Sequence, residues 1–76
     1  MKQVKINIGT INDVKEFINI VNKENFEADI AVGKYVVDAK SIMGIFSLDL
    51  SKPLDLTIHS DNCDEFLEAI SKFIVK

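Results

Sequence analysis

The spacing of apolar residues changes several times along the 76-residue chain between a period of two and a period of about 3.6. Apolar side chains on alternate residues favour a strand with one buried face, and apolar side chains three or four residues apart favour an amphipathic helix. We predict strands at residues 1–8, 28–32, 35–40 and 54–59, and helices from a cap at residue 10 or 12 to about residue 23, at residues 41–50 and at residues 63–74. This order, β-α-β-β-α-β-α, constrains the fold more than any other feature of the sequence.

Four strands that each have one apolar face require a layer of helices over one side of a sheet. We therefore predict a single α+β domain over residues 1–76, an open-faced two-layer sandwich whose second sheet face meets solvent. Gly33-Lys34 fits a two-residue hairpin turn between the second and third strands. We expect Thr10 or Asn12 to cap the first helix, and Asp61 or Asn62 to cap the last.

The composition argues against several classes of function. A net charge of -3 argues against a nucleic-acid binder, because neutralising phosphates requires a cationic surface. The chain has no arginine, and therefore no bidentate guanidinium clamp for phosphate. One cysteine and one histidine exclude a disulfide framework and leave too few ligands for a transition-metal site, so we expect no metal and no cofactor. No segment is long and apolar enough for a membrane span or an export signal, so we expect a cytoplasmic location.

Ser41 lies where the third predicted strand ends and a helix begins. Its hydroxyl can accept a hydrogen bond from the free N–H groups of that helix and act as an N-cap. The same position favours a phosphate, because free N–H groups and the helix dipole both attract negative charge. Capping is the commoner role for such a serine, and the position alone leaves both interpretations open.

The helix predicted at residues 41–50 is apolar nearly all round, although a helix on a sheet buries only one stripe. We expect Ile42, Met43 and Phe46 to remain exposed and to form a docking surface beside Ser41. The alternative is that these side chains fill gaps in a thin core.

The run from Asp38 to Leu48, with Lys-Ser-Ile-Met-Gly at its centre, resembles the regulatory-serine segment of HPr. HPr is the histidine-containing phosphocarrier of the bacterial phosphoenolpyruvate:sugar phosphotransferase system. The resemblance extends in element order over essentially the whole chain, and it implies an antiparallel sheet of strand order 1-4-2-3. It also implies that Ser41 is the target of an ATP-dependent HPr kinase, and that the three apolar residues named above dock partners in sugar transport and carbon catabolite regulation.

The start of the first helix departs from the HPr pattern, in which a phosphorylated histidine is followed by an assisting arginine. Asn12 stands in the place of the histidine and Val14 in the place of the arginine. An amide nitrogen is not nucleophilic, unlike the free nitrogen of an imidazole. Asp13 and Glu16 also add negative charge where a phosphate would approach. We therefore expect neither histidine phosphotransfer nor an enzymatic activity.

Two other residues are candidate phosphoryl acceptors. His59 is predicted on the solvent side of the fourth strand with no arginine or second titratable group nearby, which favours a simple solvated histidine. Cys63 is predicted in the first turn of the last helix, where the dipole favours a thiolate, although burial is the commoner state of a cysteine.

Three hypotheses about function follow. The first is a regulator switched at Ser41, with an HPr kinase and phosphotransferase or catabolite-control proteins as partners. The second is a phosphocarrier with a non-standard acceptor. The third is an interaction module, monomeric or weakly dimeric, that needs no phosphorylation.

Overall fold

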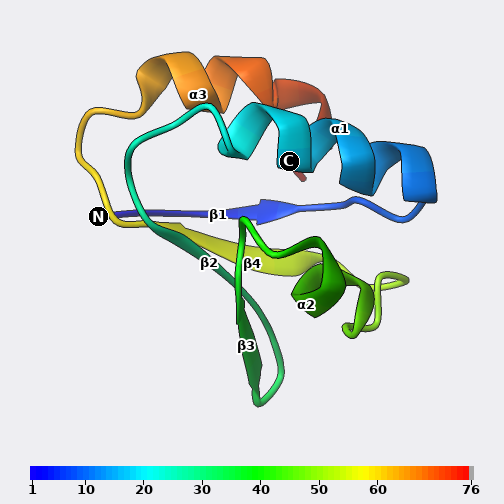
Figure 1. Cartoon of the computed structure of the whole chain (residues 1–76). Coiled ribbons are helices and arrows are strands. Elements are labelled where there is room, and N and C mark those ends of the chain that lie inside the picture. Colours follow the sequence, from blue (N-terminus) through cyan, green and yellow to red (C-terminus); the bar gives the residue numbers. More distant parts are fainter. Residues whose placement is uncertain (76) are drawn as a thin grey trace.

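The computed structural model describes residues 1–75 and has the predicted order of elements (Figure 1). The elements are β1 (Lys2–Ile6), α1 (Ile11–Val21), β2 (Ala28–Val32), β3 (Tyr35–Asp38), α2 (Ile42–Phe46), β4 (Leu54–Ile58), α3 (Asp64–Ala69) and a final 3-10 turn, η1 (Ser71–Phe73). The strands form one antiparallel sheet in the order β1-β4-β2-β3. The α+β class and the strand order are therefore confirmed. Residue 76, the last of the predicted domain, lies outside the described residues.

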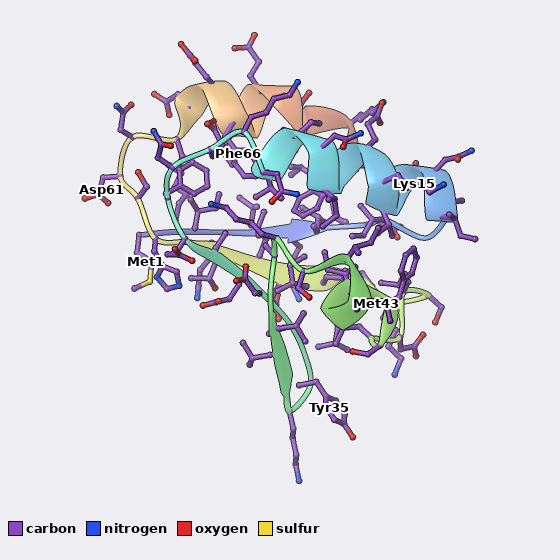
Figure 2. The ribbon with its side chains drawn as sticks, in the orientation of Figure 1. Met1, Lys15, Tyr35, Met43, Asp61 and Phe66 are labelled. Carbon is purple, nitrogen blue, oxygen red and sulfur yellow. The ribbon has the colours of Figure 1, made fainter. Side chains whose placement is uncertain are left out.

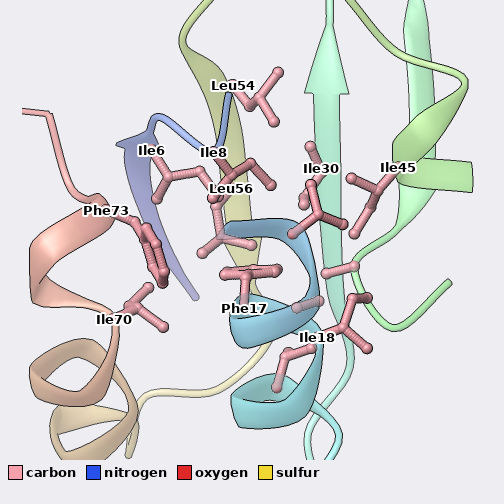
Figure 3. Packing of buried hydrophobic residues seen from close by; sticks show 14 of the residues in the cluster. Ile6, Ile8, Phe17, Ile18, Ile30, Ile45, Leu54, Leu56, Ile70 and Phe73 are labelled. Atoms are coloured by element: carbon pink, nitrogen blue, oxygen red, sulfur yellow. The ribbon is translucent and has the colours of Figure 1, made fainter. Parts of the chain in front are cut away.

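The helices cover one face of the sheet, with α1 and α3 lying above it in Figure 1. Helix α1 contacts both α3 and α2, and α2 also contacts β3. The core lies between these two layers (Figure 3). Alternate residues of β4 supply Leu54, Leu56 and Ile58, all fully buried, and α1 supplies Val14, Phe17, Ile18 and Val21. The periods of two and 3.6 in the sequence thus mark the buried sides of these elements.

Aromatic side chains connect the helices above the sheet. The ring of Phe17 meets Phe66 and Phe73 edge-to-face, each with a centroid separation of 6.4 Å. Phe26, which follows α1, makes a similar contact with Phe66 at 5.1 Å. Edge-to-face packing of this kind adds to the stabilisation that burial provides. No buried side-chain nitrogen or oxygen in residues 1–75 lacks a hydrogen-bond partner.

The two edges of the sheet differ. The C-terminal segment returns to β1, where the Val75 N–H donates to the Lys5 carbonyl at 2.8 Å and Ile74 forms a bridge with Ile6. Strand β3 forms the opposite edge, and within residues 1–75 only β2 pairs with it. The turn between β2 and β3 has Gly33 at a φ of +58° and no positive φ at Lys34, which confirms the predicted Gly-X turn.

The start of α1 confirms one of its two predicted caps, and the end of α2 corrects the predicted length of that helix. Thr10 caps α1, because its Oγ1 accepts a hydrogen bond from the Asp13 N–H at 3.0 Å, whereas Asn12 lies inside the helix. Helix α2 ends at Phe46, four residues before the predicted end. The Ser47 hydroxyl donates to the Gly44 carbonyl there, and the chain continues through turns and bends over residues 47–52. A serine side chain that bonds local backbone competes with continuation of a helix.

The predicted cap of α3 was wrong. Cys63 and not Asp61 or Asn62 is the N-cap residue; Asp61 pairs with the N-terminal amine, and the Asn62 backbone N–H donates to the Ser60 hydroxyl. Cys63 occupies the cap position, without a side-chain hydrogen bond. The helix ends at Ala69 and not at residue 74. In this segment Phe66, Ile70 and Phe73 are buried, whereas Leu67 and Ile74 are half-buried.

Candidate functional site

The N-terminus of α2 is built on Ser41. This residue has an extended backbone, with φ of −98° and ψ of 106°, and its Oγ accepts a hydrogen bond from the Gly44 N–H at 3.1 Å. Its own N–H donates to the Asp38 carbonyl at 3.0 Å, which fixes the chain as it leaves β3. Ser41 is half-buried and acts as the N-cap.

Gly44 allows α2 to approach β3 closely. A Cβ atom at this position would lie 3.1 Å from the Val37 Cβ and 3.2 Å from the Ser41 Oγ. Both distances are shorter than an ordinary van der Waals contact. The glycine in the Ile-Met-Gly run therefore sets the distance between the capped turn and the strand beneath it.

The three apolar side chains singled out in α2 are exposed, as predicted. Met43 is 78% exposed, Phe46 40% and Ile42 36%, whereas Ile45 on the inner side of the helix is fully buried. We call Ile42, Met43 and Phe46 the α2 patch; Figure 2 labels Met43. The alternative, in which these residues fill a thin core, is wrong. Ile11 at the start of α1 is also exposed, at 63%, and its place in the α1 repeat gave no sign of this.

The side chain of Lys40, the residue before Ser41, is bonded near the end of α1. Its Nζ donates to the Glu24 carbonyl at 2.9 Å, just beyond the C-terminal end of α1. A lysine at this end of a helix satisfies a backbone acceptor and complements the helix dipole. The ammonium group thus ties α1 to the segment that leads into α2.

Asn12 and Val14 lie in the first two turns of α1 in different environments. Asn12 is exposed as the second residue of the helix, and Val14 is fully buried in the core. The side chain at position 14 therefore faces away from the surface on which Asn12 lies. Asp13, in the first turn, is the acidic residue next to this surface.

His59 has a partner that the sequence analysis missed. The residue follows β4 and is exposed, as predicted, but its Nε2 lies 2.7 Å from the Asp29 Oδ2 of β2. The expectation of no second titratable group nearby was wrong. The register that places Asp29 opposite Thr57 brings the carboxylate diagonally next to His59. Cys63 is 4% exposed, so burial, the commoner state for a cysteine, is confirmed.

The loop from α2 to β4 holds a carboxylate with a perturbed pKa. The Ser51 hydroxyl and the Ser51 N–H both donate to Asp49 Oδ1. These two hydrogen bonds hold the pKa of Asp49 below its ordinary value because they stabilise the ionised form.

Neither a spanning helix nor a metal-binding cluster is found in residues 1–75. No helix there has the length and hydropathy needed to cross a bilayer. The same residues contain no group of three or more His, Cys, Asp or Glu side chains arranged to hold a metal ion.

The family follows from comparison with known sequences. A family model described as the PTS HPr component phosphorylation site matches residues 13–76. The chain belongs to the HPr family. HPr proteins are phosphocarriers and not enzymes. The match begins one residue after Asn12, where the sequence departs from the HPr pattern. No curated protein sequence matches the chain.

Solved structures of HPr proteins are similar to this fold over most of its length. HPr-C-His from Thermoanaerobacter tengcongensis is 28% identical, with a TM-score of 0.78 over 95% of this chain and 89% of that one. The phosphocarrier protein HPr from Bacillus anthracis str. Ames is 25% identical, with a TM-score of 0.71 over 97% of this chain and 94% of that one. The HPr fold is therefore present, with the capped serine and the α2 patch at one end of the helical layer.

Proposed function

We propose that this HPr-family chain is a regulator switched by phosphorylation of Ser41, and that it does not relay phosphoryl groups through a histidine. The main support is the position of Ser41, the N-cap of a helix whose next residues form the exposed α2 patch. A charge added at this cap would lie directly beside an apolar surface. Partners of the phosphotransferase or catabolite-control type fit the family.

The modification would transfer the γ-phosphoryl group of ATP to the Ser41 Oγ. A P–O bond forms to the serine oxygen, the bond to the β-phosphate breaks, ADP leaves and the hydroxyl proton is released. The phosphoserine carries a charge of about −1.5 to −2 and three acceptor oxygens. These oxygens suit the free N–H groups and positive dipole end of α2. Lys40 is held by the Glu24 carbonyl, and the chain has no arginine, so a partner would supply the guanidinium groups.

The start of α1 supports the absence of histidine relay. Asn12 has no nucleophilic nitrogen, and the buried side chain of Val14 supplies no cation to a phosphoryl group at that surface. Asp13 adds a negative charge in the same turn. The chemistry of this helix end is therefore unsuited to the family's phosphoryl relay.

The test is intact-mass analysis after incubation with an HPr kinase and ATP. We expect one phosphate on the wild type and none on Ser41→Ala. Ser47→Ala is the matched control, because Ser47 is the exposed serine at the other end of the same helix, and it should be modified as the wild type is. An unmodified wild type, or a modified Ser41→Ala variant, would overturn the proposal.

The His59–Asp29 contact supports a second candidate, a phosphocarrier that uses His59. The Asp29 carboxylate orients the imidazole, as carboxylates do for reactive histidines, but its charge also opposes the approach of a phosphoryl group. An acid-labile phosphate formed with phosphoenolpyruvate and the first enzyme of the phosphotransferase system, and lost in His59→Gln, would support this candidate. A wild type that gains no such phosphate would exclude it.

A further inference from the structure

Strand β3 presents unpaired backbone groups along the outer edge of the sheet. Tyr35 and Val37 are opposite Val32 and Ile30, and the two-residue turn makes Tyr35 and Val32 a hydrogen-bonded pair. Alternation along the strand then directs the N–H and carbonyl groups of Val36, and the N–H of Asp38, away from β2. The next bond to β2, from the Ala39 N–H to the Ala28 carbonyl at 2.9 Å, fits the same alternation.

The side chains on this edge lack the usual protection of an edge strand. Such strands are commonly very short, as β3 is, or carry a charge, a proline or a bulge that prevents pairing with other chains. The middle of β3 instead carries Val36, which is 64% exposed on the open face of the sheet. Lys34 and Asp38 lie two residues to either side of it, both are exposed, and neither forms an ion pair within residues 1–75. The edge is therefore apolar at its centre, with opposite charges at its two ends.

This arrangement is complementary to itself. When two copies of β3 are aligned antiparallel about Val36, the two valines exchange both backbone hydrogen bonds. Lys34 of each copy, in the turn that precedes β3, then comes level with Asp38 at the end of the other strand, so that opposite charges meet at both ends of the pair. Other registers fit worse. Alignment about Asp38 opposes two carboxylates, and both of its central hydrogen bonds would need the Asp38 carbonyl that already accepts from the Ser41 N–H, whereas the central bonds of the Val36 register use only groups of Val36. Alignment about Val37 uses backbone groups that are bonded to β2.

We propose that β3 is a self-association site, at which a second copy of the chain pairs antiparallel in the register centred on Val36. The pairing joins two four-stranded sheets into one continuous sheet. Because β3 has only four residues, the contact is small and the dimer is weak and reversible. The site is separate from the α2 patch and does not depend on the phosphorylation proposed above.

A charge exchange at the ends of β3 tests the register. Lys34→Asp places two carboxylates opposite each other at both ends of the dimer, and Asp38→Lys places two ammonium groups there. Each variant alone should raise the dissociation constant of the homodimer by about tenfold, since two attractive pairs become repulsive. An equimolar mixture of the two variants restores both opposite-charge pairs and should associate as the wild type does. An unfolded variant cannot produce this rescue.

Sedimentation equilibrium at protein concentrations up to about 1 mM, where association energies near 4 kcal/mol become visible, measures the dissociation constants. Met43→Asp in the α2 patch is the control and should associate as the wild type does. The proposal is overturned by a wild type that stays monomeric over this range, by single variants that associate normally, or by a mixture without rescue. Loss of association in Met43→Asp would assign the contact to the α2 patch instead.

Discussion

Replacing Ser41 with alanine tests how strongly α2 depends on its cap. The substitution removes the acceptor that lies 3.1 Å from the Gly44 N–H, in a half-buried turn where water replaces it poorly. Loss of a serine cap costs about 0.5–2 kcal/mol. Helix α2 has five residues and few internal hydrogen bonds, so we expect a loss in the upper half of that range, about 1–2 kcal/mol. With an unfolding entropy of about 2.1 cal/mol/K per residue, this lowers the Tm by roughly 6–12 °C.

Urea unfolding followed by circular dichroism measures this loss. Ser41→Asp keeps a side-chain acceptor and adds a negative charge at the dipole, so its free energy of unfolding should stay within about 0.5 kcal/mol of the wild type. Thr10→Ala removes the matching cap of α1 and provides a reference for the same chemistry elsewhere. The reasoning is refuted if Ser41→Ala is as stable as the wild type while Thr10→Ala is destabilised. That result would mean that the Gly44 N–H does not depend on the serine.

Three further changes have defined outcomes. Phe17→Ala removes a fully buried ring that packs edge-to-face with Phe66, and it should cost about 3–5 kcal/mol in urea unfolding; a loss below 2 kcal/mol would mean that the core closes over the gap. Gly33→Ala places a side chain at a φ of +58° and should lower the free energy of unfolding by about 1–2 kcal/mol in the same measurement. Unchanged stability would contradict the need for a glycine in this turn. Ser51→Ala removes the hydroxyl that most lowers the pKa of Asp49, so that pKa should rise in an NMR titration. Because the pKa of Asp49 is lower in the folded than in the unfolded protein, its ionised form stabilises the fold above the unfolded pKa, and this stabilisation is lost as the pH falls through the folded pKa. Identical titrations of Asp49 in the wild type and in Ser51→Ala would contradict this.

The fold was largely predictable because the information for it is local. The alternation of Leu54, Leu56 and Ile58 identifies the buried face of β4 without knowledge of its neighbours. The change from strand to helix spacing at Ser41 offered a cap as one of two roles for this serine, and the cap is confirmed. The exposure of Met43 followed from simple geometry, since a short helix on a sheet cannot bury apolar residues on all sides.

The errors concern choices between neighbouring polar groups and contacts between distant ones. Before α3, Ser60 accepts from the nearby Asn62 N–H, whereas Asp61 pairs with the distant N-terminal amine, and the sequence does not rank such hydrogen bonds against a helix cap. Ser47 follows the last residue of α2 and its hydroxyl donates to the Gly44 carbonyl, a hydrogen bond that the apolar pattern of the segment does not indicate. The partner of His59 is thirty residues away in the chain and depends on the register between β2 and β4. Register follows from the packing of the whole sheet, so no local pattern could show that pair.

The C-terminal segment that lies along β1 limits how far strand pairing can proceed. A sheet with two free edges can add copies without end, because each added copy offers a new edge, and this is how fibres grow. Here the Lys5 carbonyl is already occupied by the Val75 N–H, and the Asn7 N–H donates to the Phe73 carbonyl at 2.7 Å. The proposed pairing uses the β3 edge of both copies at once and leaves at each end the edge of β1, where the C-terminal segment covers residues 5–7. Pairing through β3 is therefore closed at two copies in the proposed dimer, because each β3 edge is used once and offers no further edge to a third copy.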